Sequence, residues 1–229
     1  MKNVPDAVQL ALREVFALSR MWLRYEKGED AKYISHLDFL RAMTRTLRRA
    51  EIPVSFSQGF NPHPRLSFAL PLPLGTTSIC ELMELETDME IAPEELVKRL
   101  NDFVPFGLKF IESGVSPDKN KFKAICWSKY KITPENMPSE KELEAFLGQK
   151  EIITLKKTKS GEKETDIKAE IASVKIEGKS LIMILAAGND AYLKPEFALA
   201  ALEKYIGGYS VGEYECVRTG ILDRGFGYI

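Results

Sequence analysis

The sequence predicts an α+β fold of two tandem ferredoxin-like units, each a split β-α-β arrangement with an antiparallel sheet. Two observations predict it. Apolar residues recur in the order strand, helix, strand, strand, strand, helix, strand, and this order occurs again in the second half of the chain. A polar stretch containing Pro117 separates the halves. We therefore expect an N-terminal helix over 1–20, a first unit over 21–115 and a second unit over 121–229.

The first unit is expected to begin with a strand over 21–26 and a helix over 35–51. Ser35 and Asp38 have the spacing of a capping box, and Leu40, Met43 and Leu47 recur at helical intervals. The further elements expected are a short strand over 53–57, strands over 65–72 and 79–88, a helix over 93–103 and a strand over 108–113.

The second unit is expected to repeat this order. Ser139 and Glu142 have the capping-box spacing and predict a helix over 139–147. The polar segment 157–165 predicts a solvated hairpin loop. The other elements expected are strands over 124–132 and 152–156, a hairpin of 166–176 and 181–186, a helix over 194–206 and a strand over 214–221.

Composition limits the class of protein. The chain has 229 residues, of which 45% are hydrophobic and 28% charged, and its formal net charge is −1. This is enough apolar side chain for a core, and no run approaches the roughly 18 apolar residues of a membrane span. Three widely spaced cysteines, Cys80, Cys126 and Cys216, predict reduced thiols in a cytoplasmic protein. We expect no metal site and no cofactor, since two histidines without a nearby thiolate are too few ligands.

Charge is segregated along the first half. Residues 32–65 contain six basic and two acidic side chains, whereas residues 66–102 contain two basic and eight acidic ones. Within the basic segment, four arginines share one face of the predicted helix: Arg41, Arg45, Arg48 and Arg49. Arginine suits bidentate binding of phosphate, which indicates an RNA-binding surface. The alternative is a solvated face, or one paired with the acidic stretch from Glu81 to Glu95.

A stiff loop, Gln58 to Arg65, follows the helix. Pro62 and Pro64 hold its backbone extended, and Gly59 permits a tight turn. Rings, amides and a guanidinium of this kind recognise single-stranded RNA. The alternative is a connector whose Phe60 fills the core. The candidate binding residues in the loop are Gln58, Gly59, Phe60, Asn61, His63 and Arg65.

Two histidines are the candidates for acid–base chemistry. His36 lies on the core-side stripe of the predicted helix, so a buried structural histidine is the favoured interpretation. His63 lies in the loop. A positioned histidine beside cations is sufficient for RNA cleavage, so a metal-independent endoribonuclease is an alternative function.

The run YISHLDFLRAMTRTLRRAEIPVSFSQGFNPHPRLSFALPLPLG, from Tyr33 to Gly75, resembles the signature of the uncharacterised radical-SAM-linked protein family. Members of that family stand beside, or are fused to, radical SAM and cobalamin-binding enzymes. The resemblance implies a cytoplasmic bacterial protein that works with a radical SAM enzyme. The C-x-x-x-C-x-x-C cluster motif of those enzymes does not occur in this sequence, so the chain is not expected to be the radical catalyst.

These observations combine into one hypothesis. We expect a non-catalytic accessory or substrate-recognition protein of a radical SAM enzyme, which binds RNA such as tRNA and has no membrane partner. Besides the endoribonuclease, a protein-interaction scaffold for the radical SAM enzyme stays open, because complementary charged segments also dock proteins.

Overall fold

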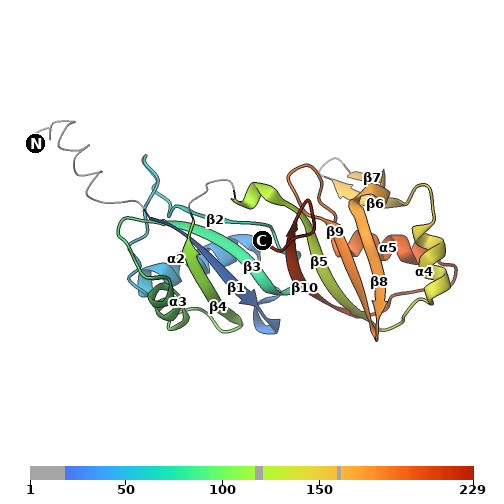
Figure 1. Ribbon diagram of the computed structural model, residues 1–229, viewed down its shortest axis with the longest axis horizontal. Helices are drawn as coiled ribbons and strands as arrows, with labels where there is room; N and C mark the ends of the chain where they lie inside the picture. The colour runs from blue at the N-terminus through green and yellow to red at the C-terminus, as the bar shows by residue number, and fades with distance from the viewer. Residues whose placement is uncertain (1–18, 117–120, 159–160) are drawn as a thin grey trace, which may run out of the picture. The chain divides into compact units, whose positions relative to one another are not determined.

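The computed structural model describes residues 19–116, 121–158 and 161–229. It shows a mixed α+β protein with a largely antiparallel sheet and, within these residues, four α-helices (Figure 1). The described residues form two compact units: unit 1, with residues 19–71 and 81–116, and unit 2, with residues 72–80, 121–158 and 161–229. The helix predicted over 1–20 lies outside the described residues except for Ser19 and Arg20, which begin strand β1 (Ser19–Lys27), so the predicted helix does not extend to residue 20.

Unit 1 has the strand order β4-β1-β3-β2. Strand β1 pairs antiparallel with β4, and β2 pairs antiparallel with β3. Side chains alternate along these strands, and Leu23, Met83 and Leu85 enter a core that helices α2 and α3 share. The elements are β1 (Ser19–Lys27), α2 (His36–Arg49), β2 (Leu66–Phe68), β3 (Thr77–Thr87), α3 (Pro93–Asn101) and β4 (Leu108–Val115).

Helix α2 is capped by hydrogen bonds at both ends. At its start, the hydroxyl of Ser35 accepts the Asp38 backbone N–H at 3.2 Å. At its end, the N–H of Ile52 donates to the Leu47 carbonyl, and the N–H of Glu51 donates to the Arg48 carbonyl. This is a Schellman motif, with Glu51 at the left-handed position (φ 52°) that glycine usually takes.

Unit 2 has the strand order β10-β5-β9-β8, and each of these pairs is antiparallel. Two residues at the start of β3, Thr77 and Ser78, pair in parallel with β10. Helices α4 and α5 pack on one apolar core with β5, β8 and β9. The elements are β5 (Ile125–Pro134), α4 (Glu140–Leu147), β6 (Ile153–Thr158), β7 (Gly161–Asp166), β8 (Ile171–Glu177), β9 (Ser180–Ala186), α5 (Pro195–Tyr205) and β10 (Tyr214–Asp223).

Most predicted elements are confirmed to within a few residues, including the capping box of Ser139 and Glu142 at the start of α4. Three differ. The strand expected over 53–57 is reduced to isolated bridges at Val54 and Phe56, and the strand expected over 65–72 is limited to β2. The loop expected over 157–165 contains β7, which pairs with β6. The tandem ferredoxin-like units stay a prediction.

The structure also bears on the expectations about membrane spans and cysteines. Among the described residues, no helix is long and apolar enough to cross a membrane. All three cysteines are free thiols, and burial raises the pKa of Cys216 to about 11.

Candidate functional site

The arginine surface comprises Arg41, Arg45, Arg48 and Arg49 of α2, and all four side chains are exposed. The opposite side of the helix buries Phe39, Met43 and Leu47, because apolar residues three or four apart fall on one face. This confirms the predicted helix and the shared arginine face, although Leu40, expected in the core, is only half-buried.

The side chains of the arginine surface make only weak contacts with the neighbouring residues that the structure describes. Arg41 forms an exposed ion pair with Asp38 at 2.9 Å, and hydrogen bonds from Ser35 and then Arg41 hold the pKa of Asp38 below its usual value. Arg49 lies over the ring of Phe103, with 5.4 Å between the guanidinium carbon and the ring centroid. Within the described residues, Arg45, Arg48 and Arg49 form no ion pair. The acidic stretch from Glu81 to Glu95 therefore does not neutralise them there.

The loop from Ser57 to His63 is closed at its base. The backbone N–H of Ser57 donates to the His63 carbonyl at 2.8 Å, and the His63 N–H donates to the Ser57 hydroxyl at 3.0 Å. Between these residues, Gly59 takes a φ of 123°, which an L side chain rarely adopts. The structure therefore gives the predicted loop a defined start and end.

The tip of this loop carries side chains that point to solvent. Phe60 is fully exposed, so the interpretation that it fills the core is wrong. Gln58, Asn61 and His63 are exposed as well. The ring of Phe60 is therefore accessible for stacking by a flat ligand.

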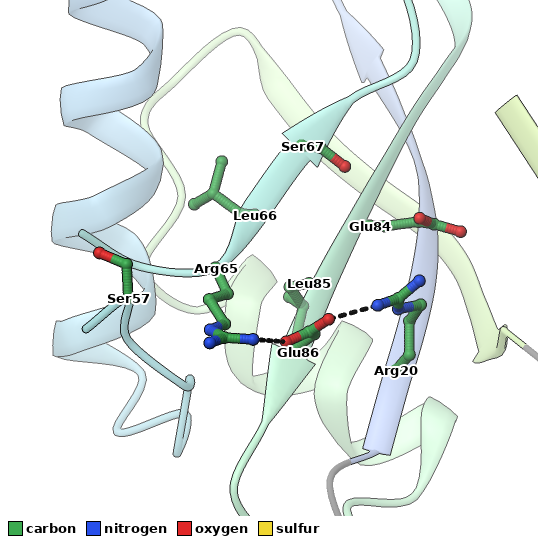
Figure 2. A pocket seen from close by; sticks show the side chains of 8 residues that line it. All are labelled: Arg20, Ser57, Arg65, Leu66, Ser67, Glu84, Leu85 and Glu86. Carbon is green, nitrogen blue, oxygen red and sulfur yellow. Dashed lines mark hydrogen bonds and ion pairs between the residues drawn. The ribbon is translucent and has the colours of Figure 1, made fainter. Parts of the chain in front are cut away.

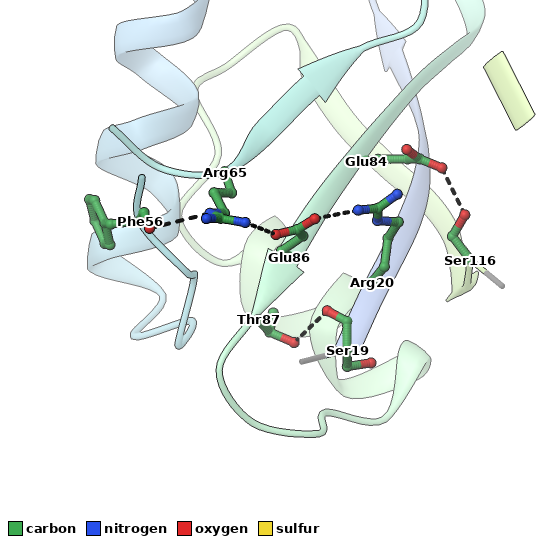
Figure 3. Close-up of polar contacts among 8 residues, drawn as sticks. All are labelled: Ser19, Arg20, Phe56, Arg65, Glu84, Glu86, Thr87 and Ser116. Carbon is green, nitrogen blue, oxygen red and sulfur yellow. Dashed lines mark hydrogen bonds and ion pairs between the residues drawn. The ribbon is translucent and has the colours of Figure 1, made fainter. Parts of the chain in front are cut away.

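Unlike the side chains at the loop tip, the Arg65 side chain is held by a hydrogen bond and an ion pair. Its Nε donates to the Phe56 carbonyl at 3.3 Å, and one terminal nitrogen pairs with Glu86 at 2.9 Å. Glu86 also pairs with Arg20 of β1, so that one carboxylate lies between two guanidinium groups (Figure 3). Arg65 thus ties the base of the loop to strand β3, while its side chain is 44% exposed and its role in binding stays a prediction.

The electrostatics of Glu86 follow from this arrangement. Burial by itself would raise the pKa of Glu86, because it disfavours the charged form. The hydrogen bonds from Arg65 and Arg20 outweigh burial, and the pKa of Glu86 is lowered overall. The carboxylate is therefore ionised at neutral pH and holds both arginines.

A pocket of about 420 Å³ opens beside this network (Figure 2). Two leucines supply its apolar wall, while charged groups of both signs and two hydroxyls supply the rest. Glu84, on the same face of β3 as Glu86, is buried and accepts a hydrogen bond from Ser116 at 2.7 Å. The lining residues are Arg20, Ser57, Arg65, Leu66, Ser67, Glu84, Leu85 and Glu86.

His36 is placed differently from the expectation. It is the first residue of α2 and is exposed, so the prediction of a buried histidine is wrong. Its ring lies nearly perpendicular to that of Phe68 of β2, with ring centroids 5.7 Å apart. The buried face of α2 begins at Phe39, so His36 at the first position of the helix contacts the rim of the core and stays accessible. Both candidate histidines, His36 and His63, are thus accessible.

Sequence reasoning missed Arg20, Ser67, Glu84 and Glu86. Arg20 was assigned to the N-terminal helix, and the two glutamates were counted only as part of an acidic stretch. Their signal was the alternation of Met83 and Leu85 with charged residues, which places Glu84 and Glu86 together on the second face of β3. The ion pair of Glu86 with Arg20 is not visible in the sequence, because β1 and β3 are far apart along the chain and their pairing brings the two residues together.

A metal centre finds no support in the described part of the chain, where no group of three His, Cys, Asp or Glu side chains is arranged to hold an ion. The arrangement instead offers exposed cations, an exposed ring and a rigid loop base. These groups suit the binding of an anionic ligand, and the exposed His36 and His63 keep acid–base chemistry open as the alternative.

Comparison with known proteins gives a family and little else. No curated protein matches the chain significantly. Among solved structures, a chain of "Crystal Structure of a Cbf5-Nop10-Gar1 Complex" is similar at 8% sequence identity and a TM-score of 0.43. That match covers 92% of this chain and 50% of the other, so this chain spans half the length of its structural neighbour. A family model described as "Uncharacterized protein conserved in bacteria (DUF2344)" matches residues 20–195. Since that match covers well over half of the sequence, the chain belongs to this conserved bacterial family.

Proposed function

We propose that this protein binds RNA through the arginine surface and the loop tip, as an accessory or substrate-recognition protein of a radical SAM enzyme. The observation that carries the proposal is the exposure of all four arginines on one helix face. Like charges at these spacings cost a few tenths of a kcal/mol per pair, and the described ion pairs offset this only at Arg41. A polyanionic ligand would remove that repulsion.

The loop adds a second kind of contact in the same unit. Stacking of a base on an aromatic ring contributes about 1–3 kcal/mol and tolerates any base. Phe60 is exposed and available for stacking, and the amides of Gln58 and Asn61 offer donors and acceptors to base edges. Arginine contacts would fix the phosphates, and the loop would select unpaired bases.

The test is RNA binding by fluorescence anisotropy at two salt concentrations. The wild type is compared with the triple variant Arg45→Ala, Arg48→Ala, Arg49→Ala. A matched control removes the same charge from exposed lysines of unit 2, as Lys163→Ala, Lys175→Ala, Lys179→Ala. We expect salt-sensitive binding that is lost in the arginine variant and retained in the lysine variant. Equal losses in both variants, or no binding by the wild type, would contradict the proposal.

The radical SAM association rests on the resemblance of Tyr33 to Gly75. Its test is co-elution of the purified chain with the radical SAM enzyme of the same organism, before and after nuclease treatment. Co-elution that needs RNA supports shared recognition of a substrate. Co-elution that survives nuclease favours a protein scaffold instead.

We also propose that each unit is ferredoxin-like. The strand orders β4-β1-β3-β2 and β10-β5-β9-β8 support this, because both follow the split β-α-β pattern with one helix in each crossover. The hairpin of β6 and β7 would then be an insertion after α4 in the second unit.

A further inference from the structure

A second pocket, of about 320 Å³, lies wholly within unit 2 and takes no part in the proposed RNA surface. This volume is at the lower end of the range of roughly 300–1,000 Å³ for small-molecule sites. One aromatic ring, four charged or amide side chains and several small residues surround it. The lining residues that matter for binding are Lys123, Trp127, Asn189, Asp190, Ala191 and Arg224.

The pocket is built at the start of β5. Trp127 stands opposite Ala186 of β9, and the backbone N–H of Ala187 donates to the Cys126 carbonyl at 2.9 Å. A bridge between Ala187 and Tyr192 then closes the turn that carries Asn189 and Asp190. Small side chains on β9 and in this turn leave the space that larger ones would fill.

The C-terminal segment forms another wall. After β10 the chain turns back, and the carboxylate of Asp223 accepts the N–H groups of Gly225 at 2.8 Å and Gly227 at 2.9 Å. Phe226 stacks on Trp127 with ring centroids 5.5 Å apart. These contacts fix the turn that contains Arg224, and they support Trp127 from one side.

The lining groups match the parts of one ligand. Trp127 offers an aromatic surface for a flat heterocycle, and the Asn189 amide has the donor and acceptor that pair with an adenine edge. Asp190 can accept hydrogen bonds from ribose hydroxyls, while Lys123 and Arg224 supply positive charge for a phosphate. We propose that this pocket binds an adenine nucleotide. The nucleotide is either free or the unpaired end of an RNA, since both present the same groups.

The two tryptophans of the chain allow a direct measurement. In a Trp22→Phe background, Trp127 is the remaining tryptophan, and AMP is titrated against its fluorescence. We expect saturable quenching by AMP, weaker quenching by adenosine and none by inorganic phosphate. An oligonucleotide ending in adenosine, compared with free AMP, distinguishes the two sources of the ligand.

Three variants in this background test the assignment. Arg224→Ala should weaken AMP binding by about tenfold, because a charge-assisted contact is lost, whereas Lys179→Ala removes an exposed charge elsewhere in unit 2 and should change nothing. Ala191→Leu should abolish binding by filling the pocket, with an unchanged circular dichroism spectrum as the check of folding. Absence of quenching in the folded Trp22→Phe protein, or equal binding by Arg224→Ala, would overturn the proposal. The triple arginine variant should bind AMP normally, so failure of the RNA proposal is recognised separately.

Discussion

Glu86 is the residue on which the base of the candidate loop depends. Its side chain is 20% exposed, and it pairs with both Arg20 and Arg65. Replacing Glu86 with glutamine keeps the shape but removes the charge that these guanidinium groups share. We expect Glu86→Gln to lower the free energy of unfolding at neutral pH by about 1–2 kcal/mol. Hydrogen bonds to charged groups contribute about 1.5–3 kcal/mol, and solvent screening of the exposed Arg65 reduces this. Urea denaturation measures it, with Glu90→Gln as an exposed control from the same acidic stretch.

The lowered pKa of Glu86 predicts that its contribution to the stability of the fold depends on pH. Because the pKa of Glu86 is lowered in the folded protein, its contribution to stability is complete above the unfolded pKa and is lost as pH falls through the folded pKa. The difference in unfolding free energy between wild type and Glu86→Gln should therefore shrink as pH falls from neutral to about 3. A difference that stays constant over this interval would show that the charge of Glu86 is not what holds the arginines.

At the scale of elements, the C-terminal end of α2 contains a strained backbone position. Glu51 has a left-handed backbone in the Schellman motif, which costs a non-glycine residue about 1 kcal/mol. Glu51→Gly should raise the free energy of unfolding by about 0.5–1 kcal/mol, after allowing for the greater freedom of glycine in the unfolded chain. Thermal and urea unfolding would measure this. Destabilisation would mean that the Glu51 side chain has contacts that outweigh the backbone strain.

Arg99 of α3 closes the same helix end from outside. Its guanidinium donates to the carbonyl of Ala50 at 2.9 Å and to that of Glu51 at 2.6 Å. We expect Arg99→Ala to speed amide exchange in the last turn of α2, because the chain that follows the helix loses these hydrogen bonds. Lys98→Ala, an exposed neighbour, is the control. Unchanged exchange in Arg99→Ala would show that the motif closes the helix without it.

Elements are predictable from the sequence where periodicity reports burial on one face, as in α2 and β1. Strand β7 was missed because almost all its side chains are exposed, so its sequence, GEKETD, has no apolar alternation. The candidate site was predictable only in part. The arginine face follows from helical spacing, but the exposure of Phe60 and His36 and the pairing of Glu86 depend on tertiary contacts that spacing does not specify.

At the scale of the whole molecule, opposite charges are segregated while the net charge is only −1. Binding of RNA should therefore depend on local contacts rather than on overall attraction, and salt should reveal their number. Each phosphate contact to a single strand contributes about 0.7 to the slope of log affinity against log salt. Removing Arg45, Arg48 and Arg49 should reduce that slope by about two if all three contact phosphates. A slope that does not change would place the phosphates elsewhere.

At the loop tip, the side chains available for binding are not the ones that hold the loop in place. A side chain added at Gly59 would meet no atom within 4 Å, although its φ would be strained, and the neighbouring Gln58, Phe60 and Asn61 are exposed. The hydrogen bonds that close the loop at Ser57 and His63 use none of these three side chains. Substitutions at Gln58, Phe60 and Asn61 therefore carry little folding penalty, so natural drift or a randomised library selected on different oligonucleotides can change what the loop reads while the scaffold stays intact.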